Sequence, residues 1–171
     1  LADEPETGTG AFDLDLTRRL AAEALGAAFL LVAVIGSGIM ATTLSPDDVA
    51  FSVMPLFHVH GLVASVLAHL AAGGEVIAPR RLAAGPFWRS LAEARVTSFS
   101  GSPTLLTMLL DGRPEDWRAP ALRFVRSCSA ALSTDLFERI ERELDVPVLQ
   151  AYGMTEASHQ IASNPLPPAR R

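Results

Sequence analysis

The sequence predicts an α/β domain in which a mostly parallel sheet carries helices on both faces. Short apolar runs of β type alternate with helical patterns about five times, and glycine or proline marks most of the boundaries. The 171 residues are enough for one packed core. Alternating strands and helices imply right-handed crossovers between parallel strands. In such sheets ligands bind at the carboxyl ends of the strands.

The first 44 residues divide into two segments. Residues 1–15 are acidic and short of large apolar side chains, which indicates a loose lead-in. Residues 16–44 are apolar, and no charge occurs from Ala24 to Leu44. Two interpretations remain open: residues 20–44 span a membrane with the preceding arginines on the cytoplasmic side, or a buried helix over about 16–32 ends at a glycine break.

Residues 45–168 contain the alternating pattern that predicts the sheet. Strands are expected over 49–54, 75–78, 96–100, 122–127 and 146–151, and helices over 61–72, 86–94, 103–110 and 133–144. Gly73 stops the first of these helices, and an early proline opens the second and third. Ser133 or Thr134 caps the fourth, whose apolar side chains recur at helical spacing.

Composition excludes several classes of function. The net charge is −5, so the chain has no nucleic-acid footprint. All 14 basic residues are arginine, which excludes any mechanism that needs a lysine from this chain. The single cysteine, Cys128, excludes a disulfide framework and favours a cytoplasmic compartment with a buried thiol.

Three strand ends carry side chains of chemical interest. His58 and His60 have metal-ligand spacing in an extended segment, although the sequence context favours imidazoles that line a pocket or cap a helix. Residues 100–104 offer hydroxyl groups at a helix N-terminus, suited to an anion or to ordinary capping. Residues 127–133 are mostly small, so a flat ring could lie against this backbone, or the segment is simply a tight turn.

A fourth strand end, Tyr152 to Glu156, has the sharpest pattern. It combines an aromatic ring, a glycine, a hydroxyl and a carboxylate. A carboxylate is a suitable magnesium ligand, and a neighbouring hydroxyl can hold a phosphate oxygen. The alternative is an N-cap threonine followed by a glutamate in the first helical turn.

Together these segments resemble the AMP-forming adenylating enzymes, which include acyl-CoA synthetases, luciferases and adenylation domains. Residues 152–156 (YGMTE) match the family's Y-G-x-T-E motif, and residues 54–62 (MPLFHVHGL) match its P-x-F-H motif. Residues 129–132 stand where the family has its adenine-side loop, and residues 101–104 resemble its acyl-pocket turn. The continuation to Pro168 is most similar to the branch that activates oxalate or malonate.

The resemblance implies a two-step reaction at the N-terminal domain of an adenylating enzyme. A small carboxylic acid attacks ATP to give an acyl-adenylate, and CoA then displaces AMP. The implied adenylate-binding residues are Ser129, Ala130, Ala131, Tyr152, Gly153, Met154 and Thr155. The implied substrate residues are His58, Gly101, Ser102 and His159, the implied catalytic residues are His58, Thr155 and Glu156, and Glu156 would hold magnesium.

The match is expected to be partial. The family's phosphate loop should precede residue 44, and its catalytic lysine lies in a small C-terminal domain; neither has a counterpart here. The chain alone is therefore expected to bind ATP weakly and to form no thioester. Residues 18–41 resemble the first transmembrane helix of aquaporin-like channels, so a membrane-anchored binding remnant is one alternative. A metal hydrolase based on His58 and His60 is another.

Overall fold

The computed structural model describes residues 16–27, 44–118, 120–155 and 160–167. The chain forms two compact units, Leu1–Ala33 and Val34–Arg171. In the first unit, residues 16–27 form a helix, as predicted for the start of this segment. Its side chains are exposed, whereas one interpretation expected a buried helix. The glycine break and most of the stretch expected to span a membrane fall outside the described residues. Within the described part of the chain, no helix is long and apolar enough to cross a membrane.

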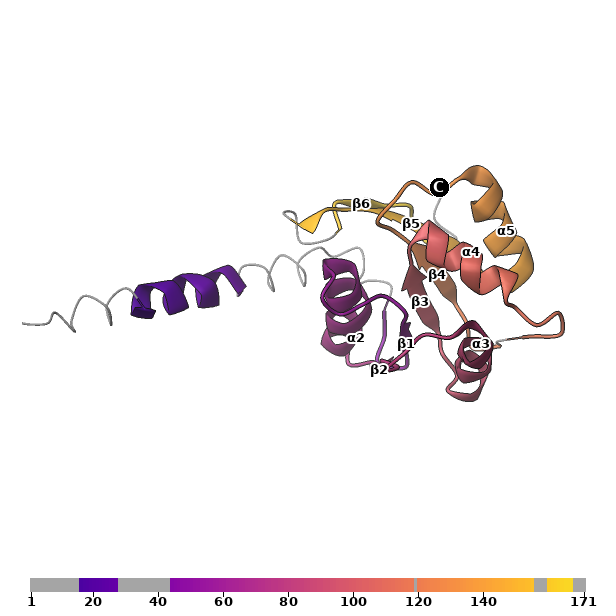
Figure 1. The fold of residues 1–171 in the computed structure, drawn as a ribbon, viewed down its shortest axis with the longest axis horizontal. Coiled ribbons are helices and arrows are strands. Elements are labelled where there is room, and N and C mark those ends of the chain that lie inside the picture. The colour runs from indigo at the N-terminus through magenta and orange to yellow at the C-terminus, as the bar shows by residue number, and fades with distance from the viewer. Residues whose placement is uncertain (1–15, 28–43, 119, 156–159, 168–171) are drawn as a thin grey trace, which may run out of the picture. The chain divides into compact units, whose positions relative to one another are not determined.

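The second unit is built on a six-stranded sheet with the order β2-β1-β3-β4-β5-β6 (Figure 1). Its strands are β1 (Val49–Ser52), β2 (Glu75–Ile77), β3 (Ser98–Gly101), β4 (Phe124–Ser127), β5 (Val148–Tyr152) and β6 (Ala162–Ser163). The first five pair in parallel, and β6 pairs antiparallel to β5. The mostly parallel α/β sheet predicted from the alternating pattern is therefore confirmed, whereas β6 was not predicted.

Helices cover both faces of this sheet. They are η1 (His60–Leu67), α2 (Ala68–Ala71), α3 (Ala84–Glu93), α4 (Pro103–Asp111) and α5 (Thr134–Leu144). In Figure 1, η1 with α2 lies on one side of the sheet, and α3, α4 and α5 lie on the other. The predicted helix over 61–72 is divided, because residues His60–Leu67 have π geometry. The following α2 ends at Ala71, shortly before Gly73, which has φ +80°.

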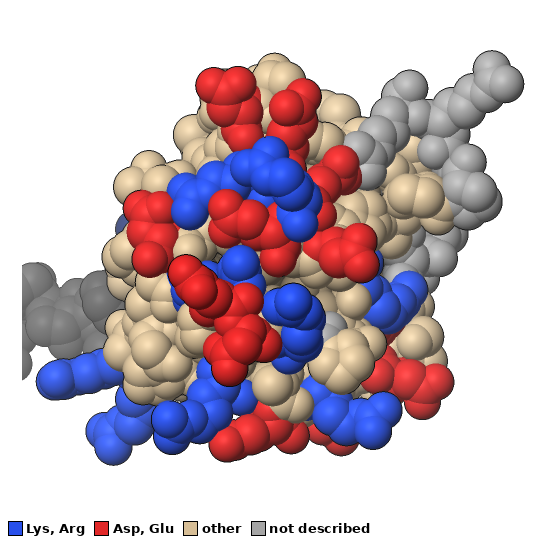
Figure 2. Space-filling view, turned by 90° about the vertical axis from the view of Figure 1, so that its right-hand side faces the viewer, with Lys and Arg blue, Asp and Glu red and all other residues tan. Residues whose placement is uncertain are grey.

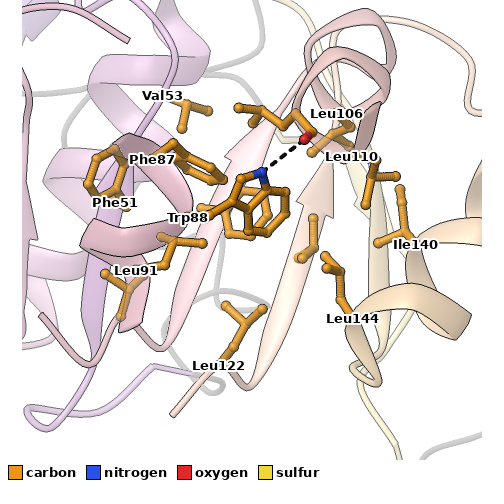
Figure 3. Packing of buried hydrophobic residues seen from close by; sticks show 14 of the residues in the cluster. Phe51, Val53, Phe87, Trp88, Leu91, Leu106, Leu110, Leu122, Ile140 and Leu144 are labelled. Atoms are coloured by element: carbon orange, nitrogen blue, oxygen red, sulfur yellow. Dashed lines mark hydrogen bonds between the residues drawn. The ribbon is translucent and has the colours of Figure 1, made fainter. Parts of the chain in front are cut away.

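The face under α3, α4 and α5 holds the main apolar core (Figure 3). Alternate strand residues share a face, so Phe51, Phe99 and Val125 all point into it. Trp88 is fully buried at its centre, and its Nε1 donates to the Leu109 carbonyl at 2.9 Å. Packing of this apolar face fixes the positions of the strands, and thus of their carboxyl ends.

The opposite face, under η1 and α2, is polar near the middle of the sheet. Ser98 and Ser100 of β3 and Arg126 of β4 are buried there. They meet His60 of η1 and His69 of α2, which are also buried. The same two-residue alternation that places Phe99 in the apolar core turns its neighbours toward these histidines. A buried polar layer thus lies behind the strand ends.

The outer surface shown in Figure 2 carries positive and negative side chains close together and no extended patch of one sign. Arg139 of α5 bonds Asp111 and Glu143 at 2.8 Å each, and Arg113 lies 3.7 Å from Glu143. These ion pairs link the end of α4 to α5.

Candidate active site

A pocket of about 520 Å³ opens at the carboxyl ends of β4 and β5. It is lined by Ser129, Ala130, Ala131, Gln150, Ala151, Tyr152, Gly153, Ala162, Ser163 and Asn164. Its volume is within the range of small-molecule sites, and its position is where parallel α/β sheets bind ligands. Two segments more than twenty residues apart in the sequence, the small-residue turn and the tyrosine corner, face each other across this space.

One wall of the pocket is the turn that follows β4. The Cys128 amide donates to the Gly101 carbonyl at 3.3 Å, and this bond ties the turn to the end of β3. Ser129 then adopts φ 75°, a left-handed conformation that favours glycine. The Ser129 Oγ lies 2.9 Å from His60 Nδ1, and this contact holds the residue in place. The small side chains of Ala130 and Ala131 leave room against the backbone.

The other wall is the end of β5, which β6 supports. The Ile161 amide donates to the Tyr152 carbonyl at 2.8 Å. Asn164 bridges the strand, since its Oδ1 accepts from the Gln150 amide at 2.5 Å and its Nδ2 donates to the Val148 carbonyl at 3.0 Å. Tyr152 remains 61% exposed, so one face of its ring is available to a ligand.

His60 connects the pocket to the polar layer behind it. Gly61 places this histidine, because a Cβ at position 61 would clash with the Met54 and Pro55 carbonyl oxygens. His60 Nε2 hydrogen-bonds Ser100 Oγ, and Arg126 Nε donates to the same oxygen at 3.0 Å. The result is one chain of contacts from β4, through β3 and η1, to the pocket wall.

Arg126 is a buried cation in this layer. Burial lowers its pKa to about 10, and the neighbouring Cys128 opposes the change. Its Nη1 donates to Gln160 Oε1 at 3.3 Å, while its Nη2 has no hydrogen-bond partner among the described residues. The guanidinium is therefore held by neutral oxygens, an arrangement that costs stability and calls for an explanation.

His69 lies deeper in the same layer. Burial, and next the charge of Arg126, lower its pKa from 6.5 to about 4. Its Nε2 lies 2.9 Å from Ser98 Oγ. In the folded chain, where sheet and helix surround it, the imidazole is consequently neutral near pH 7.

The other residues expected at the site lie around the pocket or away from it. Gly101 is buried at the end of β3, and Ser102 caps α4 by accepting from the Leu105 amide at 3.4 Å. His58 is exposed, with its ring centre 4.6 Å from that of Phe57, and is not part of the pocket lining. Met154 and Thr155 follow the lining residues and are exposed. Glu156 and His159 fall outside the described residues.

One part of the site was not predicted from the sequence. Asn164 and β6 were expected only as the start of a proline-rich ending, yet they form the outer wall of the pocket. The signal that could have found them is the short run from Ile161 to Ser163 ahead of Asn164-Pro165, a turn-forming pair.

Metal binding by the two histidines finds no support. Among the residues that the structure describes, no group of three or more His, Cys, Asp or Glu side chains could hold a metal ion. Both ring nitrogens of His60 already contact serine hydroxyls. The described residues therefore offer no ligand set for the alternative of a metal hydrolase based on His58 and His60.

A larger depression, of about 690 Å³, lies at the opposite end of the strands. Leu122, Leu144 and Val146 in its lining precede β4 and β5, so it sits at the amino ends of the strands. Ligands of parallel sheets bind at the carboxyl ends, and we therefore assign the candidate site to the pocket at Tyr152.

Comparison with known proteins identifies the family of the chain. Residues 26–171 match the AMP-binding enzyme family, and the chain belongs to that family. Because the match begins at residue 26, most of the segment that resembles a channel helix lies within it, and that resemblance is not supported.

Three proteins of known identity or structure show what this chain is similar to. The chain is 43% identical to an oxalate–CoA ligase of Saccharomyces cerevisiae over 128 residues, which are 75% of this chain and 23% of the ligase. It is also 43% identical to an oxalate–CoA ligase of Arabidopsis thaliana, over 72% of this chain and 25% of that protein. The crystal structure of MatB from Rhodopseudomonas palustris superposes with a TM-score of 0.69 at 28% identity, over 81% of this chain and 28% of MatB. The chain thus spans about a quarter of the length of these relatives.

Proposed function

We propose that this domain provides the adenylate-binding side of an AMP-forming acid–CoA ligase. In the proposed reaction a carboxylate oxygen attacks the α-phosphorus of ATP, pyrophosphate leaves, and the thiol of CoA then displaces AMP from the acyl carbon. The observation that carries the proposal is the pocket in which the turn at Ser129–Ala131 faces Tyr152 and Gly153.

The roles proposed for the pocket residues follow from their chemistry. The exposed ring of Tyr152 would stack on adenine, and the alanines opposite it would let the flat base approach the backbone. Thr155, exposed just beyond the ring, would donate to a phosphate oxygen. Glu156 would hold magnesium, which supplies charge neutralisation for the phosphates; this role rests on the family motif.

The proposed acyl substrate is a small dicarboxylate such as oxalate or malonate. This proposal rests on the identity to oxalate–CoA ligases and on the family motif, from which we propose that His159 faces the substrate carboxylate. His58, Gly101 and Ser102 would complete the acyl end of the site. CoA would be the second substrate.

Nucleotide binding by this chain tests the proposal. In saturation-transfer NMR with AMP, we expect magnetisation to reach the adenine protons. Tyr152→Ala should weaken binding by about tenfold, because stacking of a base on an aromatic ring contributes on the order of 1–3 kcal/mol. Tyr152→Phe should retain binding, since it keeps the ring and removes only the hydroxyl.

Phe57→Ala is the matched control. Phe57 is an aromatic side chain that is 85% exposed and does not line the pocket, so its removal should leave AMP affinity unchanged. Equal losses in Tyr152→Ala and Phe57→Ala would contradict the proposed adenine site.

A further inference from the structure

Three buried side chains and one exposed side chain form a continuous hydrogen-bonded row that ends in the pocket. Arg126 Nε donates to Ser100 Oγ at 3.0 Å, and Ser100 Oγ contacts His60 Nε2. His60 Nδ1 lies 2.9 Å from Ser129 Oγ. The first three side chains are buried, whereas Ser129 is exposed in the pocket lining.

The arginine gives this row a direction. A guanidinium only donates, so the Ser100 oxygen must accept at Arg126. The cation draws electron density from that oxygen and makes the Ser100 hydroxyl a stronger donor than acceptor toward His60. His60 Nε2 then accepts, and the proton of the neutral ring resides on Nδ1, which donates to Ser129 Oγ.

We propose that Arg126 is a positioning residue that acts through Ser100 and His60 to keep Ser129 as a hydrogen-bond donor to the bound substrate. Ser129 accepts from His60, and its own hydroxyl hydrogen is left to point into the pocket. The functional meaning of this arrangement rests on the proposed function, in which Ser129 lines the adenylate site.

The arrangement explains two features that are otherwise costly. Arg126 is a buried charge without a carboxylate partner among the described residues, and its use as a fixed donor accounts for its place in the layer. Ser129 has a left-handed backbone, and its contact with His60 holds a conformation that a serine rarely adopts.

The opposite direction of hydrogen bonding along the row would require the other tautomer of His60, so an experiment can distinguish the two. If His60 carried its proton on Nε2, Ser100 would accept from both Arg126 and His60, and Ser129 would have to donate to Nδ1. Its hydroxyl hydrogen would then be turned away from the pocket. The tautomer of His60 therefore reports the direction of the whole row.

The test is the ring-nitrogen spectrum of His60 in the complete 171-residue chain, labelled with ¹⁵N-histidine and free of nucleotide. His60→Gln identifies the resonances among the four histidines. We expect the Nδ1–H tautomer in the wild-type chain. Arg126→Met removes the donor, and Arg126→Lys keeps a charge without the guanidinium Nε; both should shift the population toward Nε2–H.

Arg139→Lys is the control, because Arg139 belongs to an ion-pair network on α4 and α5 that does not contact His60. The indole resonance of Trp88, bonded to the Leu109 carbonyl, shows whether each variant keeps its core. A wild-type His60 protonated on Nε2 or on both nitrogens overturns the proposal, as does a tautomer unaffected by both Arg126 variants. The measurement needs no ligand, so a failure of AMP binding would refute the proposed function and leave this result readable.

Discussion

Replacement of Arg126 by methionine is expected to stabilise the domain, although it removes two hydrogen bonds. Burial lowers the pKa of Arg126 well below its ordinary value, to about 10. At about 1.36 kcal/mol per pKa unit, keeping the guanidinium charged in the folded state costs about 3 kcal/mol. The lost bonds to Ser100 and Gln160 are worth about 1 kcal/mol each, and a buried methionine side chain returns about 1.5–2 kcal/mol.

The net expectation is a gain of about 3 kcal/mol in the free energy of unfolding, measured by urea denaturation near pH 7. The slope with urea should not change, because the variant exposes the same surface on unfolding. Arg126→Lys, which keeps a buried charge, should show no such gain. A loss of more than about 1 kcal/mol in Arg126→Met, at unchanged slope, would refute the reasoning that this cation is uncompensated.

Three further predictions concern the same unit. The pKa of His69 is lowered to about 4, so the unfolded chain binds a proton between pH 6.5 and 4 that the folded chain does not. As the pH falls over that range, this residue should remove up to about 3 kcal/mol of stability. In denaturation at pH 7 and pH 4, His69→Gln should lack this pH-dependent loss of stability. Burial raises the pKa of Asp48, but hydrogen bonds, first from Arg123, outweigh it and hold the pKa below 3.8. The resulting stability is present above about pH 4 and is lost as the pH falls through the folded-state pKa. Asp48→Asn should therefore cost about 1–3 kcal/mol at pH 7 and progressively less in acid, and a cost independent of pH would argue against the pairing. Ser129→Ala should lose about 1 kcal/mol with the His60 bond, whereas Ser129→Gly should be nearly neutral because it relieves the left-handed backbone; equal losses in the two thermal unfolding curves would mean that φ at this position is unstrained.

Much of the fold could be predicted from local patterns. The five parallel strands and the helices between them follow from alternating apolar runs, capping serines and early prolines, and Ser102 and Ser133 do accept the expected backbone bonds. The π geometry of η1 could not be predicted, because residues 60–72 have an ordinary helical composition. The two-residue strand β6 was too short to carry a periodic signal.

The site was predictable where a motif marks a strand end. The small residues at 129–131 and the ring of Tyr152 were both expected as ligand contacts, and the sheet brings them to one pocket. The polar layer was not predicted, since Arg126, Ser100 and His60 are distant in sequence and become neighbours only through strand pairing and helix docking. Side chains that meet through tertiary structure leave no local pattern.

The location of bound AMP tests the central claim most directly. In ¹H–¹⁵N spectra of the labelled chain, added AMP is expected to shift the amides of residues 129–131, 150–153 and 162–164, which line the pocket at the carboxyl ends of β4 and β5. Shifts confined to the depression around Arg113 and Arg142, at the other end of the strands, or no shifts at millimolar AMP, would contradict the assignment of this pocket as the adenylate site.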